Sequence, residues 1–398
     1  MNKQRKILLL GGSYAQLPAI EVAKKRGLYT ILVDYLTDNP GQHLTDKYIN
    51  ASTTDKKKVL EIAKDLRVDF VLAYASDPAA PTAAYVSEKL GLPGNSYESV
   101  KVLSEKHLFR NLLQKAGLNS PKSKSYSEKE ISTINKLDLD YPLIVKPVDS
   151  SGSKGVKLIE SFDEFNGAAL HALSFSRSKR VIAEEYIRAN GSQLHGDGFV
   201  IDGELSYCYL GDHHYNNAIN SFVPYSTTWP TNKTEQQLEE IYSEISKLIR
   251  YSGFQTGAIN IEVRIDNFGN IFIMEIGPRS GGNFVPKLLN YATGFNMIEA
   301  SLDAAIGKKV MVPDTEKNNA AYYVLHTNTD GVFKHISISA ILKSYINEYH
   351  QYSKKGDNVS SFQGANAALG ILLMTFPDSK TMDHVISNMD KYVEIEVD

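Results

Sequence analysis

The sequence is poor in several features that mark other classes of protein. It contains a single cysteine, Cys208, which excludes an internal disulfide framework and fits a reducing compartment. No apolar run is long enough to span a bilayer, and the run near the start is too short for a signal peptide. The formal net charge is −3, so the basic surplus that nonspecific nucleic-acid binding needs is missing. We therefore expect a cytoplasmic protein whose partners include neither a membrane nor a nucleic acid.

The composition that is present is typical of a soluble globular protein with more than one domain. Hydrophobic residues make up 42% and charged residues 22% of the 398 residues. A chain of this length is too long for one ordinary core and suggests two or three domains.

The first 100 residues alternate between apolar strands and helices. Strands are expected at Lys6–Leu10, Thr30–Asp34 and Phe70–Ala73, a spacing that favours a parallel, doubly wound sheet buried on both faces. The glycine turn after the first strand is similar to that of a dinucleotide site but lacks the full G-x-G-x-x-G pattern. We interpret it as a tight strand-to-helix turn, with cofactor binding as the alternative; its amides could also hold a substrate anion.

A second pattern predicts a hairpin that carries two carboxylates. Strands Ala258–Ile265 and Asn270–Ile276 are joined by a short turn containing Asn and Gly, which tolerate the backbone conformations of tight hairpins. Alternation along the strands lets Glu262 and Glu275 point to one face, with Arg279 just beyond. Such oxygen ligands suit Mg2+ (or Mn2+) bound to nucleotide phosphates. An exposed hairpin with an ion pair is the alternative.

A third pattern is a loop rich in glycine and serine between two strands. Lys146 interrupts the apolar strand Leu143–Lys146, and the loop Asp149–Val156 leads into a second strand, Val156–Ile159. Backbone amides in such a loop can close over phosphates, while the lysine supplies a fixed positive charge. A flexible hairpin is the alternative, and the P-loop pattern is absent.

Other segments are less specific. An amphipathic helix is expected from Ser99 to about Gly117, and a strand over Val181–Ile187 offers backbone groups to an adenine ring. Residues 211–232 show no clear period and are expected to form a long loop, which in a compact domain tends to be functional or mobile. A helix is expected around Ala340–Tyr349.

Taken in order, these motifs resemble those of the ATP-grasp superfamily of carboxylate–amine and carboxylate–thiol ligases. The resemblance rests on Lys106, Lys146-Pro147, SSGSKGV, EEYI, Glu262, Glu275 and Pro278-Arg279, and it covers nearly the whole chain. It is strongest to the branch with L-amino-acid ligases, carbamoyl-phosphate-synthase-like and purine-biosynthetic members. It implies a multidomain α/β and α+β fold: an amino-terminal parallel-sheet domain (1–118), an ATP-grasp domain (119–310) of two α+β subdomains with its lid at about 119–187, and a small carboxy-terminal α+β domain (311–398).

The resemblance also implies a role for each site residue. The nucleotide would be bound by Lys106, Lys146, Ser153, Lys154, Gly155, Val156, Glu184, Glu185, Tyr186, Ile187 and Gln193, with Glu184 on the adenine amino group. Glu262 and Glu275 would hold the metal, and Arg279, Lys146 and Glu275 would act in catalysis. Acceptor contacts are expected from His195, Asp197, Tyr215, Ser280 and Asn283. Gly277 stands where the family commonly has asparagine, and Gln193 where it usually has glutamate.

The activity expected from this resemblance is ATP-dependent ligation of a small-molecule carboxylate to an amine through an acyl phosphate, with release of ADP and phosphate. A homodimer is a family-level expectation. Activation of bicarbonate, as in carboxylases or carbamoyl-phosphate synthases, is a second hypothesis. A non-catalytic nucleotide-binding module is a third, motivated by Gly277 and Gln193.

Overall fold

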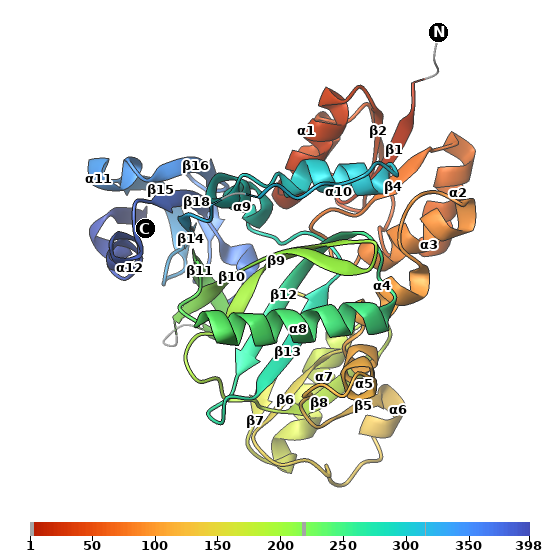
Figure 1. Ribbon diagram of the computed structural model, residues 1–398. Helices are drawn as coiled ribbons and strands as arrows, with labels where there is room; N and C mark the ends of the chain where they lie inside the picture. The colour runs from red at the N-terminus through yellow and green to blue at the C-terminus, as the bar shows by residue number, and fades with distance from the viewer. Residues whose placement is uncertain (1–3, 217–219, 315) are drawn as a thin grey trace.

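The computed structural model describes residues 4–216, 220–314 and 316–398. Its amino-terminal part is a parallel sheet with the strand order β3-β2-β1-β4, flanked by helices (Figure 1). The strands are β1 (Lys6–Leu10), β2 (Tyr29–Asp34), β3 (Lys47–Asn50) and β4 (Phe70–Leu72), and the helices are α1 (Leu17–Lys25), α2 (Lys56–Leu66) and α3 (Ala80–Leu90). Apolar side chains are buried on both faces of the sheet, which confirms the predicted doubly wound arrangement.

A smaller antiparallel sheet, with the strand order β5-β8-β6-β7, carries the loop rich in glycine and serine. Its strands are β5 (Ser123–Ser127), β6 (Leu143–Pro147), β7 (Lys157–Ile159) and β8 (Arg180–Glu185). The short helix α6 (Glu128–Ile131) follows β5, and α7 (Phe165–Ser174) packs on the sheet through a buried apolar cluster. Because β6 and β7 are neighbours, their connecting loop lies at the end of an edge hairpin.

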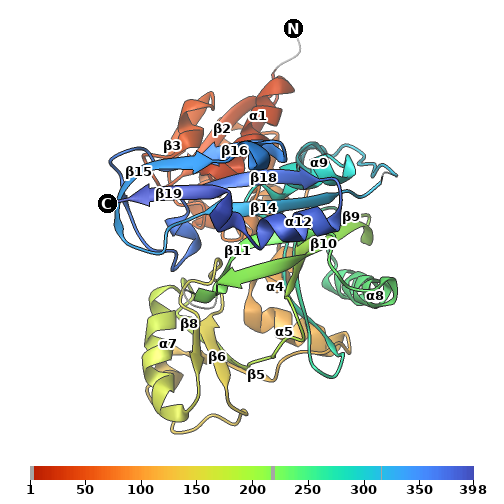
Figure 2. The same ribbon diagram turned by 90° about the vertical axis from the view of Figure 1, so that its left-hand side faces the viewer.

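One large antiparallel sheet organises the rest of the chain, with the order β13-β12-β9-β10-β11-β14-β18-β16. Its strands are β9 (Leu194–Ile201), β10 (Glu204–Asn216), β11 (Asn220–Trp229), β12 (Gly257–Ile265), β13 (Ile271–Gly277), β14 (Asn319–Leu325), β16 (Ile346–Gln351) and β18 (Gly370–Phe376). The sheet continues from the predicted carboxylate hairpin into the carboxy-terminal part of the chain (Figure 2).

Helices attach this sheet to the other two. Helix α8 (Glu235–Ser252) lies across it, and α4 (Tyr97–Ser104) and α5 (Lys106–Lys115) pack into the same apolar cluster. Helix α9 (Val285–Thr293) packs near β14, whereas α10 (Met297–Ala305) reaches the amino-terminal sheet (Figure 1). The amino-terminal sheet thus contacts α10, a helix that lies between β13 and β14 of the large sheet in the sequence.

The carboxy-terminal residues add a small sheet with the order β17-β15-β19. Its strands are β15 (Gly331–Ile338), β17 (Asn358–Val359) and β19 (Val393–Val397), and the nearby helices are α11 (Ala340–Lys343) and α12 (Ser379–Ile386). Within the described ranges, no helix combines the length and the apolarity that crossing a membrane requires.

Three predictions about local structure were wrong. The loop expected at 211–232 is largely the pair β10 and β11, whose polar side chains bond across the strands, as His213 Nδ1 does with Thr227 Oγ1 at 2.6 Å. The helix expected from Ser99 breaks at Glu105, which is extended, so that α4 and α5 are separate. The helix expected around 340–349 is α11 followed by β16. In the first and third cases pairing with other strands, rather than local pattern, decides the structure. At the helix break, the Lys106 amide donates to the Val148 carbonyl at 2.9 Å.

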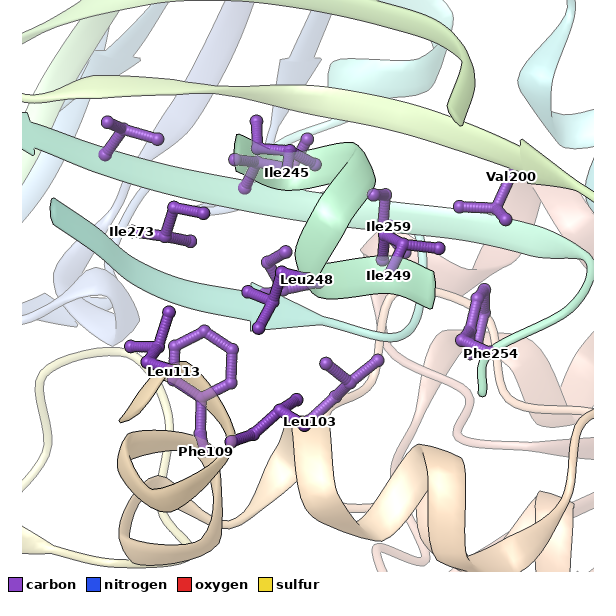
Figure 3. Close-up of a cluster of buried hydrophobic side chains, with 14 of the residues drawn as sticks. Leu103, Phe109, Leu113, Val200, Ile245, Leu248, Ile249, Phe254, Ile259 and Ile273 are labelled. Atoms are coloured by element: carbon purple, nitrogen blue, oxygen red, sulfur yellow. The ribbon is translucent and has the colours of Figure 1, made fainter. Parts of the chain in front are cut away.

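The core that supports the large sheet lies beneath α8 (Figure 3). Leu248 and Ile249 of the helix are fully buried against Ile259 of β12 and Ile273 of β13. These contacts fix the positions of β12 and β13 against α8, and with them the positions of the carboxylates that these strands carry.

We predict that Leu248→Ala lowers the free energy of unfolding by about 2–5 kcal/mol, because it leaves a cavity in a close-packed core. Chemical denaturation followed by fluorescence would measure the change. Phe268→Ala is the control: this side chain is 90% exposed in the hairpin turn, so its removal should change stability by less than about 0.5 kcal/mol. Equal losses in the two variants would contradict this description of the core.

Candidate active site

The two carboxylates of the hairpin face each other directly. Glu262 of β12 and Glu275 of β13 are paired residues in the register of these strands, and His195 of β9 is paired with Glu262 on its other side. The three side chains therefore form one row across three adjacent strands. The structure thus brings together two residues predicted as metal ligands and one predicted as a substrate contact.

The electrostatics of this row favour a bound cation. Burial, and then the neighbouring Glu275, raise the pKa of Glu262 to about 7. Gln193 Nε2 donates to Glu262 Oε2 at 2.7 Å, and Lys106 Nζ lies 3.4 Å from Glu275 Oε2. A divalent ion that replaces the proton would relieve the repulsion between the carboxylates, so the residues fit such an ion.

The described residues contain no group of three or more His, Cys, Asp or Glu side chains placed to hold a metal on their own. The protein therefore offers two carboxylates, and the remaining oxygen ligands of a hard cation would come from a bound phosphate and from water.

Lys146 belongs to a buried charge network with Glu184 and Arg110. Arg110 of α5, which is 1% exposed, donates to Glu184 through Nε at 3.0 Å and Nη2 at 3.3 Å, and Lys146 also bonds to Glu184. Burial lowers the pKa of Lys146 to about 8. Burial alone would raise the pKa of Glu184, but Arg110 and Lys146 hold it at about 2.

This network occupies the Glu184 carboxylate, which accepts from Arg110 and Lys146 and so orients the lysine. Its expected contact with an adenine amino group stays a prediction. Sequence reasoning missed Arg110, because a charged residue in an amphipathic helix is normally read as solvent-facing.

The loop between β6 and β7 is held over the site from two sides. Lys106 Nζ donates to the Ser150 carbonyl at 2.8 Å, and Ser153 Oγ donates to the Phe222 carbonyl on β11 at 2.8 Å. Gly155 has a positive φ of 73°, and a Cβ there would lie 2.9 Å from Phe175. Glycine is therefore required at 155 for both conformation and space.

The segment after β8 divides between the site and the surface. Tyr186 lies under the Arg264 guanidinium at 5.4 Å, and Arg264 donates to the Ile187 carbonyl at 2.9 Å and to Gln193 Oε1 at 2.6 Å. Glu185 instead faces Lys122 at 3.4 Å, outside the site. Of this segment, therefore, Tyr186 and the Ile187 backbone border the site, and the Glu185 side chain does not.

These elements enclose a cavity of about 380 Å³. The predicted residues that line it are Lys106, Lys146, Ser153, Lys154, Val156, Glu184, Tyr186, Gln193, His195, Tyr215, Glu262, Glu275, Arg279 and Asn283. Other residues that sequence reasoning did not assign to the site also line it, among them Asp77, His213, Arg264 and Tyr322. His213 lies in the polar segment that the sequence singled out, whereas Asp77 lies in a segment to which the sequence assigned no site residue.

The expected acceptor contacts separate into two sets. His195 lines the cavity and stacks on His213 with ring centroids 4.3 Å apart, while burial and then Arg279 lower its pKa to about 3, so it is neutral. Asp197 accepts from the Gly281 amide at 2.8 Å and does not line the cavity; burial raises its pKa to about 6. Ser280 also lies outside it, with Oγ 3.3 Å from Ser301 Oγ. Asp197 and Ser280 thus shape the turn after β13.

Fold and site together define a multidomain α/β and α+β protein with a charge-lined cavity suited to phosphate and a divalent ion. Comparison with known proteins specifies the family. Residues 139–287 match the ATP-grasp domain family. That part of the chain is therefore an ATP-grasp domain, as the sequence predicted.

Relatives of known sequence include the carbamoyl phosphate synthase large chain of Caldanaerobacter subterraneus subsp. tengcongensis. It is 26% identical over 311 residues, which are 75% of this chain and 27% of that protein. The large chain from Thermoanaerobacter sp. gives the same figures. The chain thus spans about a quarter of the length of the curated relatives it matches.

Solved structures match over the whole chain. An L-amino acid ligase from Bacillus licheniformis has a TM-score of 0.84 at 19% identity, and a phosphoribosylglycinamide synthetase from Anaerococcus prevotii has 0.78 at 19%; both comparisons cover 100% of each chain. A biotin carboxylase domain from Hydrogenobacter thermophilus, solved with MgADP and bicarbonate, has 0.77 at 15%, covering 100% of this chain and 92% of that one. These likenesses confirm the predicted fold class.

The buried lysine makes a pH prediction for nucleotide binding. Above its pKa of about 8, Lys146 loses the charge that attracts phosphate, so metal-free ADP should bind about tenfold more weakly at pH 9 than at pH 7. Isothermal titration calorimetry at pH 7, 8 and 9 would measure this. Lys146→Arg is the control, because arginine keeps its charge throughout. The same pH dependence in both proteins would contradict the assignment of the loss to Lys146.

Proposed function

We propose that the protein is an ATP-dependent ligase that joins a small carboxylic acid to an amine through an acyl phosphate, releasing ADP and phosphate. The observation that carries the proposal is one cavity in which two lysines and an arginine surround a facing pair of carboxylates: Lys106, Lys146, Arg279, Glu262 and Glu275. Phosphoryl transfer asks a protein mainly for in-line positioning and for neutralisation of charge. This set of side chains supplies both.

The nucleotide would lie in the cavity described above. Lys106 and Lys146 would contact its phosphates, and the loop Ser153–Val156 would cover them. The amides of Glu185 and Tyr186 already donate to Lys122 and Pro142 carbonyls, so the Ile187 amide is the group assigned to the adenine edge. Gln193, held between Arg264 and Glu262, would meet the ribose.

Glu262 and Glu275 would hold Mg2+ (or Mn2+), which when bound neutralises charge on the β- and γ-phosphate oxygens. Gln193 and Lys106 orient the two carboxylates through the contacts described above. Lys106 also brings a positive charge beside Glu275, so the ion would enter a site that is already partly neutralised.

The bond changes follow from the chemistry of carboxylates. A carboxylate oxygen attacks the γ-phosphorus, the bond from that phosphorus to ADP breaks, and an acyl phosphate forms. The amine then attacks the acyl carbon, loses a proton, and expels phosphate that carries one oxygen of the acid. Arg279 would stabilise the transferred phosphoryl group, since a guanidinium matches phosphate oxygens in pairs. The contact of Ser153 with β11 would keep water from the acyl phosphate.

Activation of bicarbonate is the second candidate, because it uses the same phosphoryl-transfer groups. The sequence similarity to carbamoyl phosphate synthase large chains and the structural similarity to a biotin carboxylase domain both favour it. A non-catalytic module is disfavoured, since binding ATP alone does not need Arg279 in the cavity. The homodimer and the cytoplasmic location stay predictions.

The experiment is ADP release from Mg-ATP across a panel of carboxylic acids, each with and without amino acids or ammonia. We predict release that requires one acid–amine pair, and a loss of about 100-fold or more in kcat for Glu275→Ala, because charge neutralisation at the transferred phosphoryl group is removed. Glu204→Ala, which removes a carboxylate that is 63% exposed in a surface ion pair, is the control and should retain full activity.

Release with bicarbonate alone would support the second candidate. Release that depends on neither an acid nor bicarbonate would contradict both.

A further inference from the structure

Gly277 departs from the family pattern, and the structure gives a physical reason for it. Gly277 is not among the residues with positive φ, so its backbone does not require glycine. Space does: a Cβ at 277 would lie 2.8 Å from Asp77 Oδ1 and 3.2 Å from Arg279 Cζ. The place where a side chain at 277 would begin is therefore taken by a carboxylate from the amino-terminal part of the chain.

Asp77 lies between β4 and α3 and binds Arg279 with both oxygens. Arg279 Nε donates to Oδ1 at 2.7 Å and Nη2 to Oδ2 at 2.6 Å, while Nη1 donates to the Ser280 carbonyl at 3.0 Å. A guanidinium has five N–H groups, so two, one on each terminal nitrogen, stay available. Because Arg279 lines the cavity, this remaining fork is the part that can meet a ligand.

The pair is buried and strongly charged. The Arg279 side chain is 10% exposed and that of Asp77 23% exposed. Burial alone would raise the pKa of Asp77, but Arg279 outweighs it and the pKa lies below its usual value. Asp77 also accepts from the Ser151 hydroxyl. It therefore links the amino-terminal sheet, the turn after β13 and the loop over the site.

We propose that Asp77 is a positioning residue for Arg279: it fixes the guanidinium by one edge so that the other edge addresses the transferred phosphoryl group, and Gly277 leaves the space that Asp77 occupies. The inference rests on the proposed function. It also means that the side chain absent at position 277 is replaced by that of Asp77 from the amino-terminal part of the chain, so that glycine at 277 does not indicate the loss of an active site.

The first test is Asp77→Asn, which keeps the shape but turns amide hydrogens toward the guanidinium. We expect kcat for ADP release to fall by about 10- to 100-fold, with less than about a threefold change in KM for ATP. We expect the wild type to bind AMPPNP more tightly than ADP, as measured by calorimetry. In Asp77→Asn the two affinities should become nearly equal. Asp77→Glu, which keeps the charge at a different reach, should also lower kcat while preserving the thermal midpoint.

The matched control is Asp303→Asn. Asp303 of α10 pairs with Arg26 beside α1, an ion pair that also joins the amino-terminal part to the rest but does not line the cavity. Its loss should affect thermal stability only. A purely structural role for Asp77 would give the two variants the same result.

The second test is a double-mutant cycle. Gly277→Asn should displace Asp77 and lower kcat, and combining it with Asp77→Ala should cost no more than the worse single variant, because both changes break one contact.

Independent, multiplying effects would overturn the inference, as would an unchanged kcat and AMPPNP preference in Asp77→Asn. If the wild type released no ADP with any acid–amine pair or bicarbonate, the proposed function would fail. The nucleotide preference would still test the proposed role of Asp77, because equal binding of AMPPNP and ADP by the wild type would overturn that role.

Discussion

Pairing of buried charges is the constraint on which the rest of the structure depends. A charge in an enclosed cavity loses hydration, and removing its partner leaves that loss uncompensated. Here Lys146 shares Glu184 with Arg110, and Arg279 is held by Asp77. Arg110 of α5 joins a pair that lies on neighbouring strands of the smaller sheet, and Asp77 joins the amino-terminal part to the turn after β13. Satisfying these charges therefore also fixes how separate parts of the chain meet. These cationic side chains are also the groups that a bound phosphate would contact.

The large sheet supplies the second element of the account. Its pleat and register place Glu262, Glu275 and His195 in one row, and α8 packs beneath β12 and β13. A precise row of polar groups thus stands on a close-packed apolar layer. Because the sheet continues into the carboxy-terminal strands, the carboxylates belong to a support much larger than the hairpin that carries them.

Much of this could be predicted from the sequence, because it is local. The alternation in Ala258–Ile265 fixed the orientation of Glu262, and the apolar strands of the first 100 residues indicated a parallel sheet. What failed depends on contacts between distant segments. β10 and β11 show no period because both their faces and their polar groups find partners in the fold. Nothing near Arg110 or Asp77 in the sequence signals partners at Glu184 and Arg279.

Gly277 illustrates the difference between the residue type in a sequence motif and the atoms that surround that position in the structure. Read as letters, glycine in place of asparagine suggested a weakened or inactive site. Read with the structure, it is the residue that admits Asp77 beside Arg279. A departure from a family pattern is thus informative only when the atoms that fill the vacated space are known.

The central claim is that the acid is activated by phosphoryl transfer to its own carboxylate. The most direct measurement is the fate of 18O supplied in both carboxylate oxygens of the acid that supports turnover. The account predicts that each turnover transfers one labelled oxygen to the released inorganic phosphate and leaves the other in the amide product. Phosphate without label, with the displaced 18O recovered in AMP or in water, would contradict it.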